Sequence, residues 1–247
     1  MTSGSFLTPR AAAGDDGDNL LTNLISFWEM EEASGTRVDA VVASGNDLTD
    51  NATVTQNPGK VGNAAQFTLA NSEWLSHVSN ASLQFGDIDY TFTAWVYLDT
   101  KPEATNQNIM GKNNGTAEQW LFYNNDAGED RFRFVIYNGV GTVVADQTAS
   151  AFGSPSTATW YFAVGWFDSV GGNIFISINN GTVNSSAKTG TPGTNSVTFG
   201  VGAKDAAATP FSGRIDQVAI WKRVLTAAER TWLYNSGNGR AFSELGP

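Results

Sequence analysis

A short segment near the middle of the chain carries the residue types that best suit ligand binding. Trp120 and Tyr123 are followed closely by Asn125, Asp126 and Asp130. Aromatic rings stack on the apolar C–H faces of sugars, while amide and carboxylate groups hydrogen-bond to sugar hydroxyls. The segment therefore predicts a carbohydrate-binding site. The competing interpretation places Trp120 in the hydrophobic core and makes the sequence NNDAGED a solvated loop.

Acidic residues also occur elsewhere, but their spacing does not favour catalysis. Glycoside hydrolysis needs two carboxylates that face each other, and side chains on one face of a strand are separated by one residue. The run Glu29–Glu32 follows a predicted strand, and Glu129 and Asp130 are adjacent. The chain has no cysteine, a single histidine and no Gly-x-Ser-x-Gly sequence. We therefore predict that the protein is not an enzyme, with hydrolysis by two scattered carboxylates as the open alternative.

Charge and composition argue against two classes of partner. The chain has 24 acidic and 14 basic residues, a formal net charge of −10, which repels nucleic-acid phosphates and anionic lipids. It contains no apolar run long enough to span a membrane. Its 41% hydrophobic and 12% aromatic content suffices for the core of one large domain. We expect no nucleic-acid partner and no membrane insertion.

The elements that must position these residues are predicted to be short strands. Residues 90–98 form the clearest strand, because apolar or aromatic side chains occupy both alternating sets of positions, as in a strand buried on both faces. The dipeptide Asn180-Gly181 predicts a type I′ hairpin turn. Further strands are predicted at 24–28, 64–69, 74–78, 119–124, 131–137, 160–168, 173–179, 197–201 and 214–221. Strands that recur at short spacing between turn residues are typical of a β-sandwich.

One helix is predicted near the C-terminus. Thr226 and Glu229 have the spacing of a capping box, in which each side chain hydrogen-bonds to the backbone of the other residue. Gly237 stands where such a helix would end. A single terminal helix after a long series of strands is a strong topological indication.

Four sequence patterns in this order resemble a laminin-G-like domain of the concanavalin A-like lectin/glucanase superfamily, over about residues 21–242. They are LISFWEMEEASGTRVDAVVASGNDLT, NAAQFTLANSEWLSHV with LQFGDIDYTFTAWVYL, TWYFAVGWFDSVGGNIFISINNGTV, and GRIDQVAIWKRVLTAAERTWLY. The resemblance implies an all-β fold, a two-sheet antiparallel jelly-roll sandwich with one short C-terminal helix. It also implies that the concave face and the loops at one rim bind glycans or partner proteins.

The same resemblance implies a structural calcium ion that joins an early loop to the last strand. Asp39 and Asp216 are the matching metal-ligand candidates, and calcium prefers oxygen ligands of this kind. The alternatives are that Asp216 accepts hydrogen bonds from backbone and that Asp39 is a turn residue.

Two regions are expected in the chain: a flexible or anchoring arm at residues 1–20 and a laminin-G-like domain at residues 21–247. The arm lacks the layout of a secretory signal peptide. Together with the extracellular type of fold, this favours a binding or decoration module on the surface of a phage virion, in the capsid, tail or fibre. The arm would attach to capsid or tail proteins, and the domain would contact host-surface glycans; a homo-oligomer is compatible. The alternatives are a glycan-cleaving enzyme of the superfamily and a carbohydrate-binding domain of a secreted protein.

Overall fold

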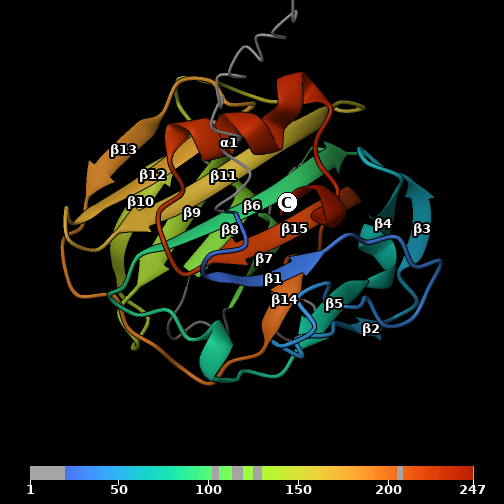
Figure 1. The fold of residues 1–247 in the computed structure, drawn as a ribbon, viewed down its shortest axis with the longest axis horizontal. Helices are drawn as coiled ribbons and strands as arrows, with labels where there is room; N and C mark the ends of the chain where they lie inside the picture. Colours follow the sequence, from blue (N-terminus) through green and yellow to red (C-terminus); the bar gives the residue numbers. More distant parts are fainter. Residues whose placement is uncertain (1–19, 102–105, 113–118, 125–129, 205–207, 247) are drawn as a thin grey trace, which may run out of the picture.

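The computed structural model describes residues 20–101, 106–112, 119–124, 130–204 and 208–246, and for residues 119–124 the backbone alone. Within these residues the chain forms two antiparallel sheets and one short α-helix (Figure 1). The predicted all-β jelly-roll sandwich with a C-terminal helix is confirmed. Residues 1–19 lie outside the described residues, so the arm stays a prediction.

Each sheet draws its strands from distant parts of the chain. The eight-stranded sheet runs in the order β13 (Asn184–Ala187), β12 (Asn173–Ile178), β11 (Trp160–Asp168), β6 (Tyr90–Leu98), β15 (Gly213–Trp221), β4 (Asn63–Phe67) and β3 (Thr55–Pro58), and β1 (Leu24–Trp28) also pairs with β15. The seven-stranded sheet runs in the order β10 (Val143–Thr148), β9 (Arg131–Tyr137), β8 (Gln119–Asn124), β7 (Gln107–Lys112), β14 (Phe199–Val201), β5 (Trp74–His77) and β2 (Thr49–Asn51).

The main core fills the space between the two sheets. Strand β6 lies between β11 and β15, and Phe92 and its alternate neighbours face this core. Phe134 of the opposite sheet reaches Phe92, with ring centroids 5.9 Å apart. Gly165 of β11 makes room for that ring, because an added Cβ there would lie 2.9 Å from Phe134 Cγ. Close packing across the sheets therefore requires a glycine at this position.

A second apolar cluster covers the outer face of the eight-stranded sheet. Helix α1 (Ala227–Tyr234) lies over this face (Figure 1). Its Leu233 and Tyr234 belong to one apolar cluster with Trp95, Phe162 and Trp221 of β6, β11 and β15. The remaining helical elements are short 3₁₀ turns at Leu69–Asn71, Ala81–Leu83, Asn235–Gly237 and Phe242–Glu244. None of the helices in the described part of the chain is long and apolar enough to cross a membrane.

The predicted helix start is confirmed, and its end is corrected. Thr226 and Glu229 form the capping box in both directions. The helix ends at Tyr234 rather than near Gly237, because Asn235 adopts the left-handed conformation (φ 48°) and acts as the C-cap. Asparagine is one of the few non-glycine residues that tolerate this conformation.

Candidate functional site

The residues of the predicted carbohydrate site are only partly placed. Trp120 and Tyr123 lie in β8, and their side chains are not among those described. Asn125 and Asp126 lie outside the described residues. Asp130 is partly exposed, and its carboxylate lies 3.6 Å from Nζ of Lys101. The site therefore stays a prediction.

Asp39, the first predicted metal ligand, is buried and holds its loop against β1. Its Oδ1 accepts hydrogen bonds from the backbone N–H groups of Phe27 (3.0 Å) and Val41 (2.9 Å). The Ser44 hydroxyl donates to Oδ2. These contacts give Asp39 a turn-stabilising role, the alternative that the sequence left open.

Asp216, the second predicted metal ligand, is fully buried on the outer face of β15. Its Oδ2 accepts hydrogen bonds from the backbone N–H groups of Lys60 (2.7 Å) and Val61 (2.9 Å) in the β3–β4 turn. Its Oδ1 is buried and has no hydrogen-bond partner. Burial raises the pKa of Asp216 to about 7, against the lowering effect of the backbone N–H groups, and the nearby Glu31 carboxylate adds to the rise.

The surroundings of Asp216 are chemically suited to a hard cation. Asp216 Oδ1 and Oε1 of the adjacent Gln217 are both buried oxygens without a hydrogen-bond partner. Such oxygens are the ligands that calcium prefers. The described residues contain no group of three or more acidic or histidine side chains that could hold a metal ion. Amide and carbonyl oxygens would therefore have to supply much of the coordination. In the described structure no hydrogen bond joins Asp39 to this place.

A row of partly exposed side chains crosses the outer face of the eight-stranded sheet. In the backbone register Trp160 of β11, Tyr97 of β6, Arg214 of β15 and Gln66 of β4 lie directly opposite one another on successive strands. We call these four residues the outer row. Strands in a sheet are spaced about 4.8 Å apart, so the row extends over about 14 Å.

Aromatic and cationic groups are in contact along the outer row. The rings of Tyr97 and Trp160 have centroids 5.4 Å apart at an angle of 57°. Cζ of Arg214 lies 3.7 Å from the Tyr97 centroid and 5.5 Å from the Trp160 centroid. Arg214 also donates a hydrogen bond of 2.7 Å from Nη1 to the carbonyl of Pro58. Gln66 donates to Oδ2 of Asp99 at 2.9 Å. The arrangement combines two adjacent aromatic rings with a guanidinium stacked over one of them and a side-chain amide on the next strand.

A second cation lies beside the outer row. Nζ of Lys60 is 4.9 Å from the ring centroid of Trp95. Trp95 is two residues from Tyr97 on β6, so the two side chains share a face at a spacing of about 7 Å. Tyr234, the last residue of α1, stacks on Trp95, with the two ring centroids 5.8 Å apart.

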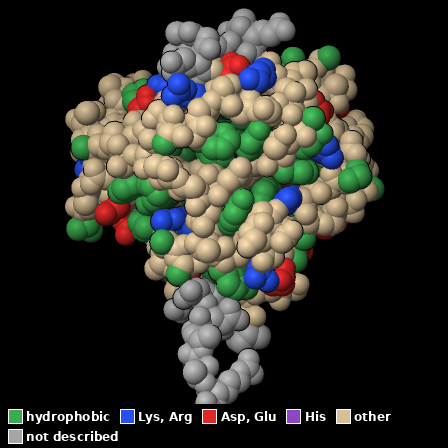
Figure 2. All heavy atoms as spheres, turned by 90° about the horizontal axis from the view of Figure 1, so that it is seen from above, with side chains coloured by type: hydrophobic (Ala, Val, Ile, Leu, Met, Phe, Trp, Pro, Cys, Tyr) green, Lys and Arg blue, Asp and Glu red, His purple; other side chains and the backbone are tan. Residues whose placement is uncertain are grey.

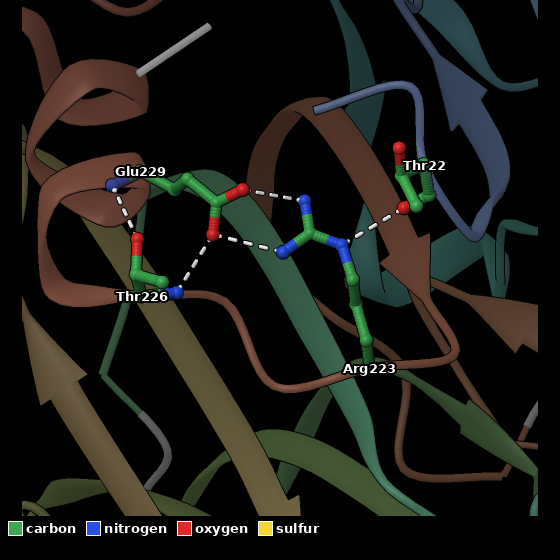
Figure 3. Close-up of a pocket in the computed structure, with 4 residues that line it drawn as sticks. All are labelled: Thr22, Arg223, Thr226 and Glu229. Atoms are coloured by element: carbon green, nitrogen blue, oxygen red, sulfur yellow. Dashed lines mark hydrogen bonds and ion pairs between the residues drawn. The ribbon is translucent and has the colours of Figure 1, made fainter. Parts of the chain in front are cut away.

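An open pocket of about 280 Å³ lies where α1 begins, lined by Thr22, Arg223, Thr226 and Glu229 (Figure 3). Arg223 donates to both carboxylate oxygens of Glu229, at 2.8 and 2.6 Å. Burial acts to raise the pKa of Glu229, but the hydrogen bonds from Arg223 and from the Thr226 backbone outweigh it and hold the pKa below its usual value. Nε of Arg223 donates to the carbonyl of Thr22 (2.8 Å). The polar groups of this pocket are thus engaged in anchoring the helix.

The family model for the concanavalin A-like lectin/glucanase superfamily matches residues 69–229, well over half of the chain. The chain belongs to this superfamily. The match includes most strands of both sheets and the start of α1. A search of the curated proteins gives no match.

Several solved structures share this fold. Domain 4 of AbnA, an extracellular GH43 arabinanase from Geobacillus stearothermophilus, has a TM-score of 0.65 at 16% identity, over 88% of this chain and 98% of that one. The binding domain of Paraclostridial Mosquitocidal Protein 1 has the same score and identity, over 88% of this chain and 53% of that one. The binding domain of botulinum neurotoxin DC has a TM-score of 0.59 at 14% identity, over 88% of this chain and 52% of that one. At these identities the similarity establishes the fold alone.

The outer row was missed in the sequence because nothing local marks it. Tyr97, Trp160 and Arg214 each lie in a strand that was predicted, but they are far apart in the chain. Arg214 gives the only hint, since a charged residue in a strand must face a surface or a partner. Membership of the superfamily does not identify the outer row either.

Proposed function

We propose that this protein is a non-catalytic carbohydrate-binding module that uses the outer row as its sugar platform. The observation that carries the proposal is the pair of adjacent, partly exposed rings of Tyr97 and Trp160, with the Arg214 guanidinium stacked over Tyr97 and the Gln66 amide on the next strand. Rings of this kind stack on sugar C–H faces, and the neighbouring polar groups bind hydroxyls. The arabinanase domain was solved in complex with arabinotriose, and the neurotoxin domain in complex with SialylT, which supports the proposal by analogy of fold.

The proposal that the module is non-catalytic is supported by the buried acidic side chains. In the described residues these are Asp39, Glu73, Asp216 and Glu229, and each accepts a hydrogen bond from a backbone N–H group. Such carboxylates stabilise turns and caps rather than face a substrate. Incubation with a bound glycan should release no new reducing ends, and their steady release would favour a glycan-cleaving enzyme.

Glycan-array screening followed by titration calorimetry tests the binding function. We expect Tyr97→Ala or Trp160→Ala to weaken binding of the best glycan about tenfold, because one stacking surface is lost. Trp232→Ala removes a partly exposed aromatic ring elsewhere and should leave the affinity unchanged. Trp120→Ala tests the alternative carbohydrate site that the sequence predicts at residues 120–130. If only that variant loses binding, the platform lies at residues 120–130 and the outer row is not the site.

A structural calcium ion is proposed to brace the β3–β4 turn against β15. Asp216, Gln217 and Glu31 would bind the ion through oxygen atoms. The ion would place a compensating positive charge beside the buried Asp216 carboxylate. Its role would be to stiffen the turn that carries Lys60. The ion would have no part in a reaction.

The setting that we propose for this module is the surface of a phage virion. Residues 1–20, small and acidic in composition, would attach the domain to capsid or tail proteins and leave the domain to contact host-surface glycans. On the face shown in Figure 2, Lys and Arg side chains are scattered rather than gathered into one patch, which agrees with a partner other than nucleic acid. Electron microscopy of native particles tests the setting. Particles assembled with a chain lacking residues 1–20 should carry no density for the domain.

A further inference from the structure

We infer that the outer row and Lys60 form a subsite for an acidic sugar residue, one that carries a carboxylate or a sulfate. The inference rests on the proposed carbohydrate-binding function and specifies the class of glycan. Its basis is a pair of cations, Lys60 and Arg214, that lie over neighbouring aromatic rings of β6.

Some cations of the described residues take part in no ion pair, namely Lys60, Lys204, Arg214, Lys222 and Arg230. Of these, only Lys60 and Arg214 lie over neighbouring rings of one strand. Within the described residues neither Lys60 nor Arg214 takes part in an ion pair, although the chain carries a net charge of −10. The cations that form ion pairs there include Arg37, Lys101, Arg133, Lys188, Arg223 and Arg240. An acidic protein offers many carboxylates with which a cation could pair. Two neighbouring cations without a carboxylate partner therefore indicate a binding site for an external anion.

The geometry favours a sugar acid over a small inorganic anion. Arg214 is stacked on Tyr97 and bound to the Pro58 carbonyl, so its guanidinium plane is held in a defined orientation. A guanidinium in that state binds a planar carboxylate or a sulfate with directional hydrogen bonds. The partly exposed Trp160 ring, next to Tyr97, provides a surface for the apolar face of the same sugar. Lys60, over the Trp95 ring two residues before Tyr97 on β6, is placed for a second acidic group or for the ring hydroxyls.

Besides buried Asp216, which accepts a hydrogen bond from the Lys60 backbone N–H, an exposed carboxylate lies at the border of the subsite. Asp99 is exposed, and its Oδ2 accepts the hydrogen bond from Gln66, the residue opposite Arg214. It forms no ion pair with Arg214 in the described structure. Its negative charge repels an approaching anion. Neutralising Asp99 should therefore strengthen binding of an acidic sugar, whereas neutralising Lys60 or Arg214 should weaken it.

Titration calorimetry at low salt compares three trisaccharides: a uronic-acid trisaccharide, a sulfated one and a neutral one. We expect at least one acidic trisaccharide to bind about tenfold more tightly than the neutral one, because a hydrogen bond to a charged group contributes more than a neutral one. The preference should shrink as salt is added. The carboxylate and sulfate arms identify which acidic group is recognised.

Variants of single residues locate the subsite. Lys60→Gln and Arg214→Gln should each weaken binding of the acidic trisaccharide about tenfold. Arg214→Lys, which keeps the charge, should have a smaller effect. Asp99→Asn should strengthen binding a few-fold. Lys188→Gln, with the same charge change at a cation paired with Asp87, serves as the matched control and should leave the affinity unaltered. Circular dichroism and the melting temperature verify that each variant is folded.

The possible results separate this inference from the proposed function. Equal affinity for neutral and acidic trisaccharides overturns the acidic subsite and leaves the carbohydrate-binding function intact. Binding of the acidic trisaccharide that is unchanged in folded Lys60→Gln and Arg214→Gln overturns the location. Absence of binding to every glycan on the array and in solution overturns both proposals. If Arg214→Gln lowers the melting temperature but leaves the affinity unchanged, the guanidinium only packs on Tyr97 and does not bind the sugar, which overturns its place in the subsite.

Discussion

At the scale of single residues, the backbone satisfies most of the buried carboxylates. Both carboxylate oxygens of Asp39 accept hydrogen bonds. Glu229 accepts hydrogen bonds from Arg223 and from the backbone at the start of its own helix. Asp216 differs, because one of its oxygens has no hydrogen-bond partner while its pKa is raised to about 7. A buried carboxylate in that state destabilises the fold whenever it is ionised, unless a cation lies beside it.

The effect of Asp216 on stability should depend on pH in a defined direction. A carboxyl whose pKa is raised in the folded state stabilises the fold while protonated, and this contribution is lost as pH rises from about 4 to about 7. The difference between the ordinary value of 3.8 and about 7 corresponds to about 4 kcal/mol. In chelator, the free energy of unfolding of the wild type should therefore fall over this range, while Asp216→Asn should show a flatter profile.

Calcium provides the control for that experiment. Added calcium should raise the melting temperature of the wild type at pH 7 and flatten its pH dependence, because the cation stabilises the ionised form. Asp216→Asn should respond much less. Identical urea-unfolding profiles for the two proteins from pH 4 to pH 8, with and without calcium, would contradict both the raised pKa and the proposed ion.

At the scale of elements, α1 shows how a short helix is made stable. Eight residues are too few for a stable isolated helix, so capping and packing must hold it. The capping box of Thr226 and Glu229 satisfies backbone groups at its start. Arg223 ties Glu229 to the preceding strand segment, and Leu233 buries the apolar side of the helix against the eight-stranded sheet. The helix therefore seals the second apolar cluster.

Loss of the cap should have a measurable cost. Thr226→Ala removes the hydrogen bond that the Glu229 N–H donates to Thr226 Oγ1 and should lower the free energy of unfolding by about 1 kcal/mol. Thr226→Ser keeps the hydroxyl and should stay close to the wild type. Urea denaturation followed by tryptophan fluorescence measures both. Equal losses in the two variants would show that the methyl group, rather than the cap, carries the effect.

At the scale of the whole molecule, aromatic side chains join the two sheets. Phe134 projects from the seven-stranded sheet to meet Tyr90 and Phe92 of β6, and it lies against Gly165 of β11. The three strands come from positions far apart in the chain, so these contacts form only when both sheets are complete. Such long-range packing makes unfolding cooperative across the domain.

Truncation at the centre of this packing should be severe. Phe134→Ala leaves a cavity between the sheets and should cost about 3–5 kcal/mol in the free energy of unfolding. Val170→Ala, at a position 94% exposed, should change it by less than about 0.5 kcal/mol. Chemical denaturation with near-ultraviolet circular dichroism measures both. A loss below about 1 kcal/mol in Phe134→Ala would mean that the sheets do not share one close-packed core.

Local patterns predicted much of the fold. The alternation at Tyr90–Leu98 and the capping box at Thr226 depend on neighbours in sequence, and both are confirmed. The hairpin near residue 180 was predicted one residue too late, because Asn179 and Asn180 both adopt positive φ and Gly181 closes the turn on the Ile178 carbonyl. Edge strands such as β2 and β3 were missed, since short polar segments are ordered by their partners rather than by their own residues.

By itself, the sequence determined the class of the fold, its strongest strands, its one α-helix and its superfamily, because alternation, turns and caps are properties of neighbouring residues. Only the tertiary structure decided that the outer row exists. Trp160, Tyr97 and Arg214 meet because strand pairing sets a register among segments distant in the chain, and no local pattern encodes that register. The tertiary structure also decided that Asp216 is buried with one oxygen unsatisfied, because burial depends on which turn folds over a strand.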